Sequence, residues 1–234
     1  MNSPIAIIDA RAPQEAKEKL SQFFSVHEFM SRNTTYKAIE GHPDVFMCQI
    51  APNKIIYAPN TPIETQAIIR THAPRSTIGA ISTGKELHNS TPYNCIVTKH
   101  HLFHKQDYTD TIIKQKCIHT EFIHLPQAYT RCSMIQLPDG ACITSDQGIV
   151  KQLQKTHIPH IYCKPETIHL PPYKHGFIGG TMGVFNNTVY CIGSLHTLKN
   201  NSELRQFIHN HKCTIVELYN GPLYDGGGIF FIST

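Results

Sequence analysis

The apolar positions of the chain recur as pairs of short runs, each pair separated by a two-residue turn. Residues 45–60 read VFMCQIAPNKIIYAPN, residues 132–146 read CSMIQLPDGACITSD, and residues 180–194 read GTMGVFNNTVYCIGS. The turns are Pro-Asn, Pro-Asp and Asn-Asn, which are residues that favour tight turns. Two apolar runs joined in this way are typical of a β-hairpin. The pattern therefore predicts three hairpins.

A helix-like segment follows each hairpin. We expect Thr61, Asp146 and Ser202 to cap these helices, since a side-chain oxygen there accepts a hydrogen bond from a free backbone N–H group. Glu64 completes a capping box with Thr61, and Pro62 suits the first helical position. Apolar residues at helical spacing define the faces that we expect to be buried: Ile63, Ala67 and Ile68; Ile149, Val150 and Leu153; and Leu204, Phe207 and Ile208.

A third short strand is predicted after each helix, at residues 77–81, 160–163 and 214–219. The repeating unit is thus strand, strand, helix, strand, with a period of roughly 40 residues. Residues 93–125 give a weaker copy, with strands at 93–98, 100–104 and 120–125 and a helix at 109–118. Four units result, near 42–82, 93–125, 130–165 and 177–219.

The two ends of the chain supply the parts of a fifth unit. Residues 5–30 contain a strand (IAIID), a helix (PQEAKEKLSQFF) and a strand (VHEFM), so one strand is missing. Residues 228–234 are a single apolar strand, which would be an exposed edge if it had no partner. We expect it to pair with Ile5–Asp9 and to close residues 1–234 into one ring-shaped α/β domain. The alternative is a flexible tail on an ordinary α/β domain.

Glycines precede two of the strands that would line the centre of this ring. Gly179 and Gly180 precede the strand in the 177–219 unit, and Gly226, Gly227 and Gly228 precede the last strand. Glycine permits positive φ and a close approach of two backbones. We therefore expect these residues at a narrow axial mouth.

A five-fold pseudo-symmetric ring of ββαβ units resembles the pentein, or α/β-propeller, superfamily. This resemblance covers nearly the whole chain as architecture. Penteins include arginine and agmatine deiminases, dimethylarginine hydrolases, amidinotransferases and the non-catalytic ribosome factor called initiation factor six. The segments GHPDVFMC, TSDQGI and FIGG are also similar to those of an uncharacterised bacterial domain family, which implies no activity.

The end of the chain departs from the catalytic pentein pattern. Agmatine-deiminase-like proteins end in a Gly-rich turn followed by an apolar residue, His and the nucleophilic Cys. The corresponding segment here, GGGIFFIST, keeps the glycines and Ile229 but has Phe230 and Phe231 at the His and Cys positions. The resemblance therefore places no nucleophile at its usual position.

Polar residues from separate units are expected to meet at the axial mouth, where they would face a small-molecule ligand. Cys132 is the candidate nucleophile, and a nearby His would hold it as thiolate. His42 or His196 would be the general acid or base, and Asp44 and Asp225 would hold a cationic group such as a guanidinium. Further candidate ligand-binding residues are Asp146, Tyr129, Gly179, Gly180 and Gly226.

Each candidate also has a structural interpretation. Asp146 suits a helix cap, and His42 and Asp44 suit a turn around Pro43. Cys132 aligns with Phe46 and Gly180 in the repeat and suits the core. His196 and Asp225 also suit loop and turn positions. The sequence leaves these alternatives open.

Composition and charge exclude several classes. The net charge is +4, and Lys and Arg form no run of five or six, so no nucleic-acid partner is predicted. No apolar run reaches the length of a membrane span, and MNSPIAIIDA lacks the basic region of a signal peptide. The eight Cys include no C-x-x-C pair, which favours reduced thiols and a cytoplasmic protein. The sequence does not specify an oligomeric state.

The 16 histidines raise the question of a metal site. His100, His101 and His104 lie close together in HHLFH, but no acidic partner has the H-E-x-x-H spacing. Solvated histidines are the default there, and we expect neither a metal nor a cofactor. Two functional classes stay open. One is an enzyme that acts on a guanidino or amide C–N bond by thiol chemistry; the other is a non-catalytic binding or scaffold ring, as in initiation factor six.

Overall fold

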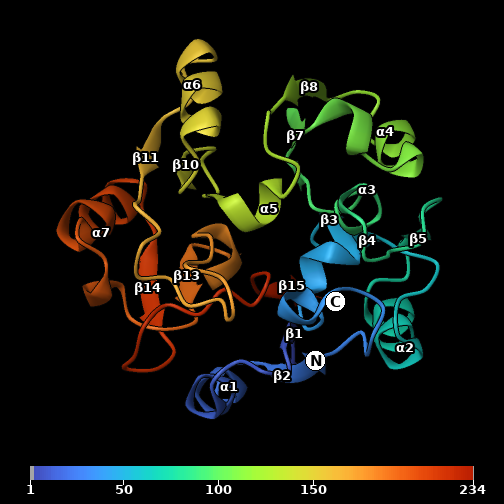
Figure 1. The fold of residues 1–234 in the computed structure, drawn as a ribbon, viewed down its shortest axis with the longest axis horizontal. Coiled ribbons are helices and arrows are strands. Elements are labelled where there is room, and N and C mark those ends of the chain that lie inside the picture. Colours follow the sequence, from blue (N-terminus) through green and yellow to red (C-terminus); the bar gives the residue numbers. More distant parts are fainter. Residues whose placement is uncertain (1–2, 234) are drawn as a thin grey trace.

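Five small three-stranded sheets surround a common axis in the computed structural model, which describes residues 3–233 (Figure 1). The helices α1, α2, α4, α6 and α7 lie at the periphery in this view, whereas α5 lies nearer the centre. The architecture is the five-fold pentein-like propeller that the repeat predicts. The expected domain of 1–234 and the strand of 228–234 extend to Met1, Asn2 and Thr234, which lie outside the described residues.

Four units are continuous in sequence, and each contains two strands, a helix and a third strand. The first contains β3 (Met47–Ala51), β4 (Lys54–Tyr57), α2 (Ile63–His72) and β5 (Thr77–Ile78). The second contains β6 (Ile96–Val97), β7 (His101–His104), α4 (Thr111–Lys116) and β8 (Glu121–His124). The third contains β9 (Met134–Gln136), β10 (Cys142–Thr144), α6 (Gln147–Lys155) and β11 (His160–Tyr162). The fourth contains β12 (Met182–Phe185), β13 (Thr188–Cys191), α7 (Asn201–Asn210) and β14 (Thr214–Glu217).

The remaining unit joins the two ends of the chain. It contains β1 (Ile5–Asp9), α1 (Gln14–Ser21), β2 (Ser25–Phe29) and β15 (Phe230–Ile232). β15 pairs antiparallel with β1, with Ile5 opposite Ile232 and Ile7 opposite Phe230. The predicted pairing of the terminal strands is therefore confirmed, and β15 has the same place in its sheet as the first strand of every other unit.

Short helices connect or enter these units. They are η1 (Lys37–Ile39), η2 (Pro43–Val45), α3 (Leu87–Ser90), η3 (Gln106–Tyr108), α5 (Thr130–Ser133), η4 (Gly179–Thr181) and η5 (Leu195–Thr197). Three of them, η2, α5 and η4, lead directly into the inner strands β3, β9 and β12. The entrances to the inner strands are thus tight helical turns, which bring polar side chains to the axis.

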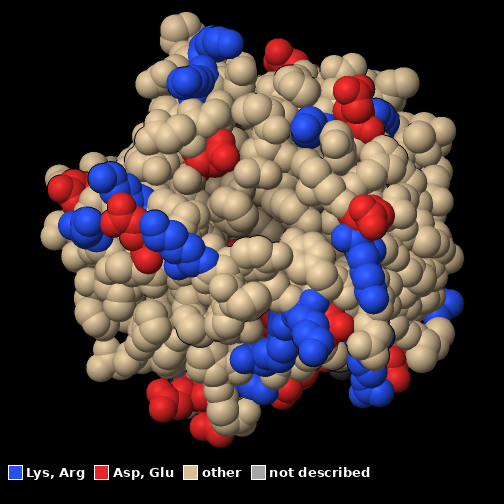
Figure 2. Space-filling view, in the orientation of Figure 1, with Lys and Arg blue, Asp and Glu red and all other residues tan. Residues whose placement is uncertain are grey.

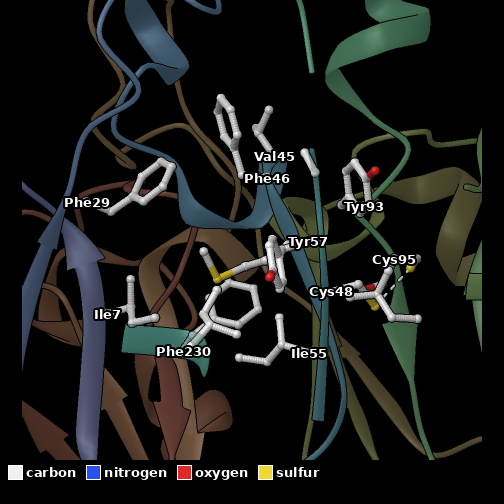
Figure 3. Close-up of a cluster of buried hydrophobic side chains, with 14 of the residues drawn as sticks. Ile7, Phe29, Val45, Phe46, Cys48, Ile55, Tyr57, Tyr93, Cys95 and Phe230 are labelled. Carbon is white, nitrogen blue, oxygen red and sulfur yellow. Dashed lines mark hydrogen bonds between the residues drawn. The ribbon is translucent and has the colours of Figure 1, made fainter. Parts of the chain in front are cut away.

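Contacts between inner strands hold neighbouring units together. The backbone N–H of Ile229 donates to the carbonyl of Met182 at 3.2 Å, which links β15 to β12. The amide of Gln49 donates to the carbonyl of Phe231 at 2.8 Å, which links β3 to β15. Between β3 and β6, the Sγ atoms of Cys48 and Cys95 lie 3.2 Å apart as free thiols (Figure 3).

Apolar side chains fill the spaces between units. One cluster packs Ile7 and Phe230 of the terminal unit against Phe46, Ile55 and their neighbours from the next unit (Figure 3). In a second cluster, Phe231 meets aromatic rings on both sides, with centroid distances of 4.7 Å to Phe24, 5.5 Å to Phe185 and 5.3 Å to Tyr190. The phenylalanines at the end of the chain therefore belong to the core.

The helix starts agree only partly with the expected caps. The Asp146 carboxylate accepts a hydrogen bond from the N–H of Ile149 at 2.8 Å and caps α6 as predicted. The predicted capping box at α2 was wrong: the Thr61 hydroxyl donates to the carbonyl of Ala58 instead. The predicted cap at Ser202 was also wrong, because α7 begins at Asn201 and includes Ser202. Both helices start with no side-chain cap.

The buried face of α2 also differs from the predicted one. Thr65 and Ile69 are buried, whereas the side chain of Ile63 is 64% exposed. The face is rotated towards Thr65, whose hydroxyl lies 2.8 Å from Nε2 of His27 on β2, and an apolar pattern cannot detect a buried threonine. In α6 and α7, the buried residues Ile149, Leu153, Leu204 and Ile208 agree with the expected faces.

The third strands are shorter than predicted: β5, β11 and β14 end at residues 78, 162 and 217. All eight cysteines are buried and free, in agreement with the reduced thiols that the sequence predicts. Between residues 3 and 233, no helix has both the length and the apolar character that a bilayer span requires.

Candidate functional site

Four polar side chains from three entrances meet at the axis, and we call His42, Asp44, Cys132 and Asp225 the axial cluster. All four are buried, with exposed fractions of 3% or less. The Cys132 thiol donates to Oδ2 of Asp44 at 2.8 Å. His42 Nε2 lies 3.1 Å from the carbonyl oxygen of Asp225 and 4.0 Å from its carboxylate. The entrances thus bring a thiol, an imidazole and two carboxylates together.

Local structure explains how each residue reaches this position. His42 is the residue before η2 and Asp44 lies within it, with Pro43 at its first position. Cys132 lies on the single turn of α5, just before β9. Asp225 precedes the glycines that lead into β15. Because every inner strand begins at the same end of the ring, residues just before these strands converge.

Asn94 is a member of this region that the sequence pattern did not indicate. Its side-chain amide donates to Cys132 Sγ at 3.4 Å and to the backbone carbonyl of Asp44 at 3.3 Å. Its side-chain oxygen accepts the backbone N–H of Cys132 at 3.1 Å. Asn94 lies just before β6, at the same place in its unit as the other cluster residues, and this position was the available signal.

Two buried atoms of the axial cluster have no hydrogen-bond partner among the described residues: Nδ1 of His42 and Oδ1 of Asp44. His42 contacts a carbonyl oxygen through Nε2, which requires that Nε2 carries the proton. Nδ1 of the neutral ring is then a free acceptor. Both atoms can accept a hydrogen bond. A ligand that donates to them would remove the cost of leaving a buried acceptor unsatisfied.

Burial controls the protonation of the cluster. It raises the pKa of Asp44 and of Asp225 to about 6, and it raises the pKa of the Cys132 thiol well above its usual value. It lowers the pKa of His42, with Asp225 acting in the opposite direction. At neutral pH the cluster therefore contains a thiol, a neutral imidazole and two carboxylates.

Arg131 adds a positive charge beside the cluster. Its guanidinium donates to the carbonyls of Gly179 at 2.7 Å and Met182 at 3.0 Å, and lies 5.6 Å from the centroid of the Phe230 ring. Burial lowers the pKa of Arg131, and Asp44 is the main group that opposes this effect. At Gly228, which has φ +77°, a Cβ would lie 2.6 Å from an Arg131 nitrogen, so glycine is required there.

The predicted glycines line the mouth through close contacts. The N–H groups of Gly226 and Gly228 donate to the carbonyl of Gly180 at 3.0 and 2.7 Å. A Cβ on Gly180 would lie 1.8 Å from the Asp225 carboxylate, and one on Gly179 would lie 2.3 Å from the Arg131 carbonyl. Close approach, rather than positive φ, explains Gly179 and Gly180.

Tyr129 lies next to the cluster in a chain of hydroxyl groups. Its hydroxyl is 3.1 Å from that of Tyr36 and 2.7 Å from that of Ser90. Burial raises the pKa of both phenols, and the Cys132 thiol contributes in the same direction. On the face shown in Figure 2, charged side chains lie in small groups mostly towards the rim, around a hollowed centre.

Two candidate residues make no hydrogen bond to the cluster. Asp146 caps α6 and accepts a second hydrogen bond from Gln127 at 3.3 Å. His196, on η5, contacts the hydroxyl of Ser194 at 2.6 Å, and this hydroxyl donates to Glu217. The hydrogen bonds of Asp146 thus agree with a helix cap, and those of His196 agree with a loop position.

Among residues 3–233, His42, Asp44 and Cys132 are the one group whose geometry is compatible with a metal ion, with ligand atoms within 4.8 Å of one another. The histidines of HHLFH do not converge. His100 is exposed, whereas His104 is buried on β7 and contacts Thr109 and the carbonyl of Ala128 at 2.8 and 2.9 Å.

Comparisons with known proteins agree with this architecture. A family model described as "Family of unknown function (DUF6873)" matches residues 7–230. No curated protein sequence matches the chain. An amidinotransferase, SxtG from Microseira wollei in the saxitoxin biosynthetic pathway, superposes with a TM-score of 0.54 and 10% identity, over 92% of this chain and 88% of that one. A dimethylarginine dimethylaminohydrolase adduct with 4-chloro-2-hydroxymethylpyridine superposes with a TM-score of 0.53 and 11% identity, over 92% of this chain and 91% of that one. At these identities the likeness shows the pentein fold.

Proposed function

We propose that this chain, which belongs to the family of unknown function DUF6873, cleaves or transfers a guanidino or amide C–N bond through the thiol of Cys132. The observation that carries the proposal is the 2.8 Å contact between Cys132 Sγ and Asp44, with His42 and Asp225 beside it. The fold is shared with an amidinotransferase and a dimethylarginine dimethylaminohydrolase, whose names describe guanidino chemistry. This kinship supports the substrate class.

The two carboxylates explain the choice of a cationic substrate. Asp44 and Asp225 are both buried, and their pKa values of about 6 reflect the cost of two carboxylates without a sufficient counter-charge. A guanidinium bound between them would relieve this cost and donate hydrogen bonds to both. Its positive charge would also lower the pKa of the Cys132 thiol, so the substrate would help to form the nucleophile.

The first step would form a covalent intermediate. The Cys132 proton passes to Asp44 Oδ2, and Sγ bonds to the central carbon of the substrate. The C–N bond then breaks, its electron pair stays on the leaving nitrogen, and that nitrogen takes the proton from Asp44. The intermediate is an amidino group, or an acyl group for an amide, attached to Cys132.

The second step would use His42 as general base. Its Nδ1 has no partner and can accept a proton from water, whose oxygen then bonds to the carbon. The C–S bond breaks, and the Cys132 thiolate recovers the proton from His42. If an amine replaces the water, the same steps describe group transfer. In either case the nucleophile comes from the entrance of β9, because Phe230 and Phe231 of β15 belong to the core.

Labelling with a cationic alkylating agent tests this proposal. We expect 2-chloroacetamidine to modify Cys132 selectively at pH 7, at a rate at least tenfold above that of neutral chloroacetamide, as mapped by peptide mass spectrometry. D44N and D225N should lose this preference for the cation, whereas C142A, which removes another buried thiol, should retain it. Equal rates for both reagents at Cys132, or even labelling of all eight thiols, would refute the proposal.

A non-catalytic ring is the second candidate, and a specific observation favours it. The Arg131 guanidinium already lies on the axis near Asp44, and every member of the axial cluster is buried. A protein that only binds a partner needs this cluster for structure and not for chemistry. Uniformly slow alkylation of all thiols, in a folded protein, is the result that this candidate predicts.

A further inference from the structure

A second polar region lies on the same axis, at the end where the hairpins turn. It is a cavity of about 650 Å³, which is within the usual size range of small-molecule sites. All five inner strands contribute to its wall. The residues at its rim, such as Pro52, Lys99, Pro138 and Asn186, belong to the hairpin turns of four units. The cavity is therefore a feature of the whole ring and not a gap between two units.

The charge of the wall has one sign. Arg131 and Lys99 line the cavity, and none of the acidic residues that the structure describes does so. Two carbonyls accept hydrogen bonds from the Arg131 guanidinium, one through each terminal nitrogen. A guanidinium has five N–H groups, so three of them have no acceptor in the described chain. These groups are available to an anion in the cavity.

The rest of the wall combines apolar surface with side-chain amides. Ile135, Val184 and the rings of Phe230 and Phe231 provide apolar area. The amide nitrogen of Gln49 donates to Pro52 and Phe231 carbonyls, which fixes the side chain. A basic group within an apolar wall, with a few oriented amides, is suited to a ligand that has an anionic head and an apolar body.

We propose that this axial cavity binds a small organic anion, a carboxylate attached to an apolar group, with Arg131 and Lys99 as its charge partners. None of the four residues of the axial cluster lines the cavity. Arg131 does line it and lies beside Gly228, whereas the preceding Gly227 lies beside His42 and Asp44. The cavity is therefore a site of its own. Binding there does not require that Cys132 has any catalytic role.

Fluorine NMR with 4-fluorobenzoate tests the proposal on the complete chain. We expect line broadening that titrates to saturation, and weaker binding of the neutral 4-fluorobenzamide by at least tenfold, because charge-assisted hydrogen bonds are lost. R131Q should weaken 4-fluorobenzoate binding about tenfold or more. K99E, at the exposed rim, should also weaken it, whereas K116E on the distant α4 should not.

Because R131Q removes buried hydrogen bonds, a second variant tests the location without changing charge. V184W adds bulk to the cavity wall, and we expect it to reduce binding of 4-fluorobenzoate at least fivefold while the circular dichroism spectrum stays that of the parent. Equal binding of the benzoate and the benzamide would overturn the proposal. So would binding that is unchanged in both K99E and V184W.

Discussion

Asp44 is an ionisable side chain with no exposed surface, and its protonation therefore affects the stability of the fold. Burial raises its pKa from 3.8 to about 6. Between these values the folded protein holds a proton that the unfolded chain releases. The contribution of Asp44 to the free energy of unfolding therefore falls as pH rises from about 4 to about 6. Above pH 6 the buried carboxylate is ionised, and its full destabilising effect is present.

D44N should remove this cost. We expect the free energy of unfolding of D44N to be about 1–2 kcal/mol higher than that of the parent at pH 7.5, after allowance for the weaker contact with Cys132. The advantage should shrink towards pH 4, as measured by urea unfolding across this range. D107N, at an exposed position, should show no such trend. A D44N variant that is less stable by the same amount at every pH would contradict the assignment of a buried carboxylate.

His104 has the opposite effect. Burial lowers its pKa from 6.5 to about 4, so the unfolded chain takes up a proton before the folded protein does. The neutral ring contacts Thr109 and the carbonyl of Ala128. The stabilisation that the neutral His104 ring provides is complete above pH 6.5 and is lost as pH falls through 6.5 towards 4.

H104Q should therefore be less stable than the parent at pH 7, by about 1–3 kcal/mol, because a buried hydrogen-bonded group is disturbed. The difference should narrow between pH 6.5 and 4.5, since Gln does not titrate. The control is H100Q, whose ring is exposed on the preceding turn. Parallel stability curves for H104Q and the parent would show that His104 titrates normally.

At the scale of elements, the turn residues were the feature of the sequence that best predicted the strands. The hairpins β3–β4, β9–β10 and β12–β13 were predictable because Pro-Asn, Pro-Asp and Asn-Asn favour short antiparallel connections. The predicted two-residue turn was wrong for β9–β10, where residues 137–141 connect the strands. The pairing of β15 with β1 followed from counting strands in the incomplete unit. The start of α2 was not predictable from residue types, because the Thr61 hydroxyl has a competing acceptor, the carbonyl of Ala58.

β15 should hold the ring closed mainly through Phe231. This ring is 5% exposed and contacts Phe24 of its own unit and Phe185 and Tyr190 of the neighbouring unit. F231A should lower the free energy of unfolding by about 3–5 kcal/mol, the usual cost for a buried Phe, in chemical denaturation. F23A is a matched control because Phe23 is 46% exposed beside the same cluster, and its effect should stay below about 1 kcal/mol. Similar losses for both variants would mean that β15 is not part of the core.

At the scale of the whole molecule, the ring brings residues that are distant in sequence to one axis. His42, Asp44, Cys132 and Asp225 were expected to meet because they precede inner strands, and this argument needs only the repeat. Asn94 precedes β6, so the same argument could have included it, whereas it does not reveal the role of Arg131. Whether a side chain before a strand points along the axis or outwards depends on a single helical turn, such as α5, which no periodicity describes.

Arg131 connects the two ends of the axis through its charge. On one side it lies near Asp44 and Cys132, and on the other side it lines the cavity. Its positive charge favours the thiolate of Cys132. An anion bound in the cavity would neutralise part of this charge, so the pKa of Cys132 should rise and alkylation should slow.

Saturating 4-fluorobenzoate should therefore reduce the rate of Cys132 alkylation by iodoacetamide on the order of threefold at pH 8, equivalent to about half a pKa unit. Because only ionisation changes, the rate should converge with that of the free protein at higher pH; a blocked route to the sulfur would instead lower the rate at every pH. 4-Fluorobenzamide should have no effect, and R131Q should react slowly with or without the anion. If fluorine NMR shows full occupancy and the alkylation rate is unchanged, the cavity and the axial cluster are electrostatically independent, and Arg131 does not connect them.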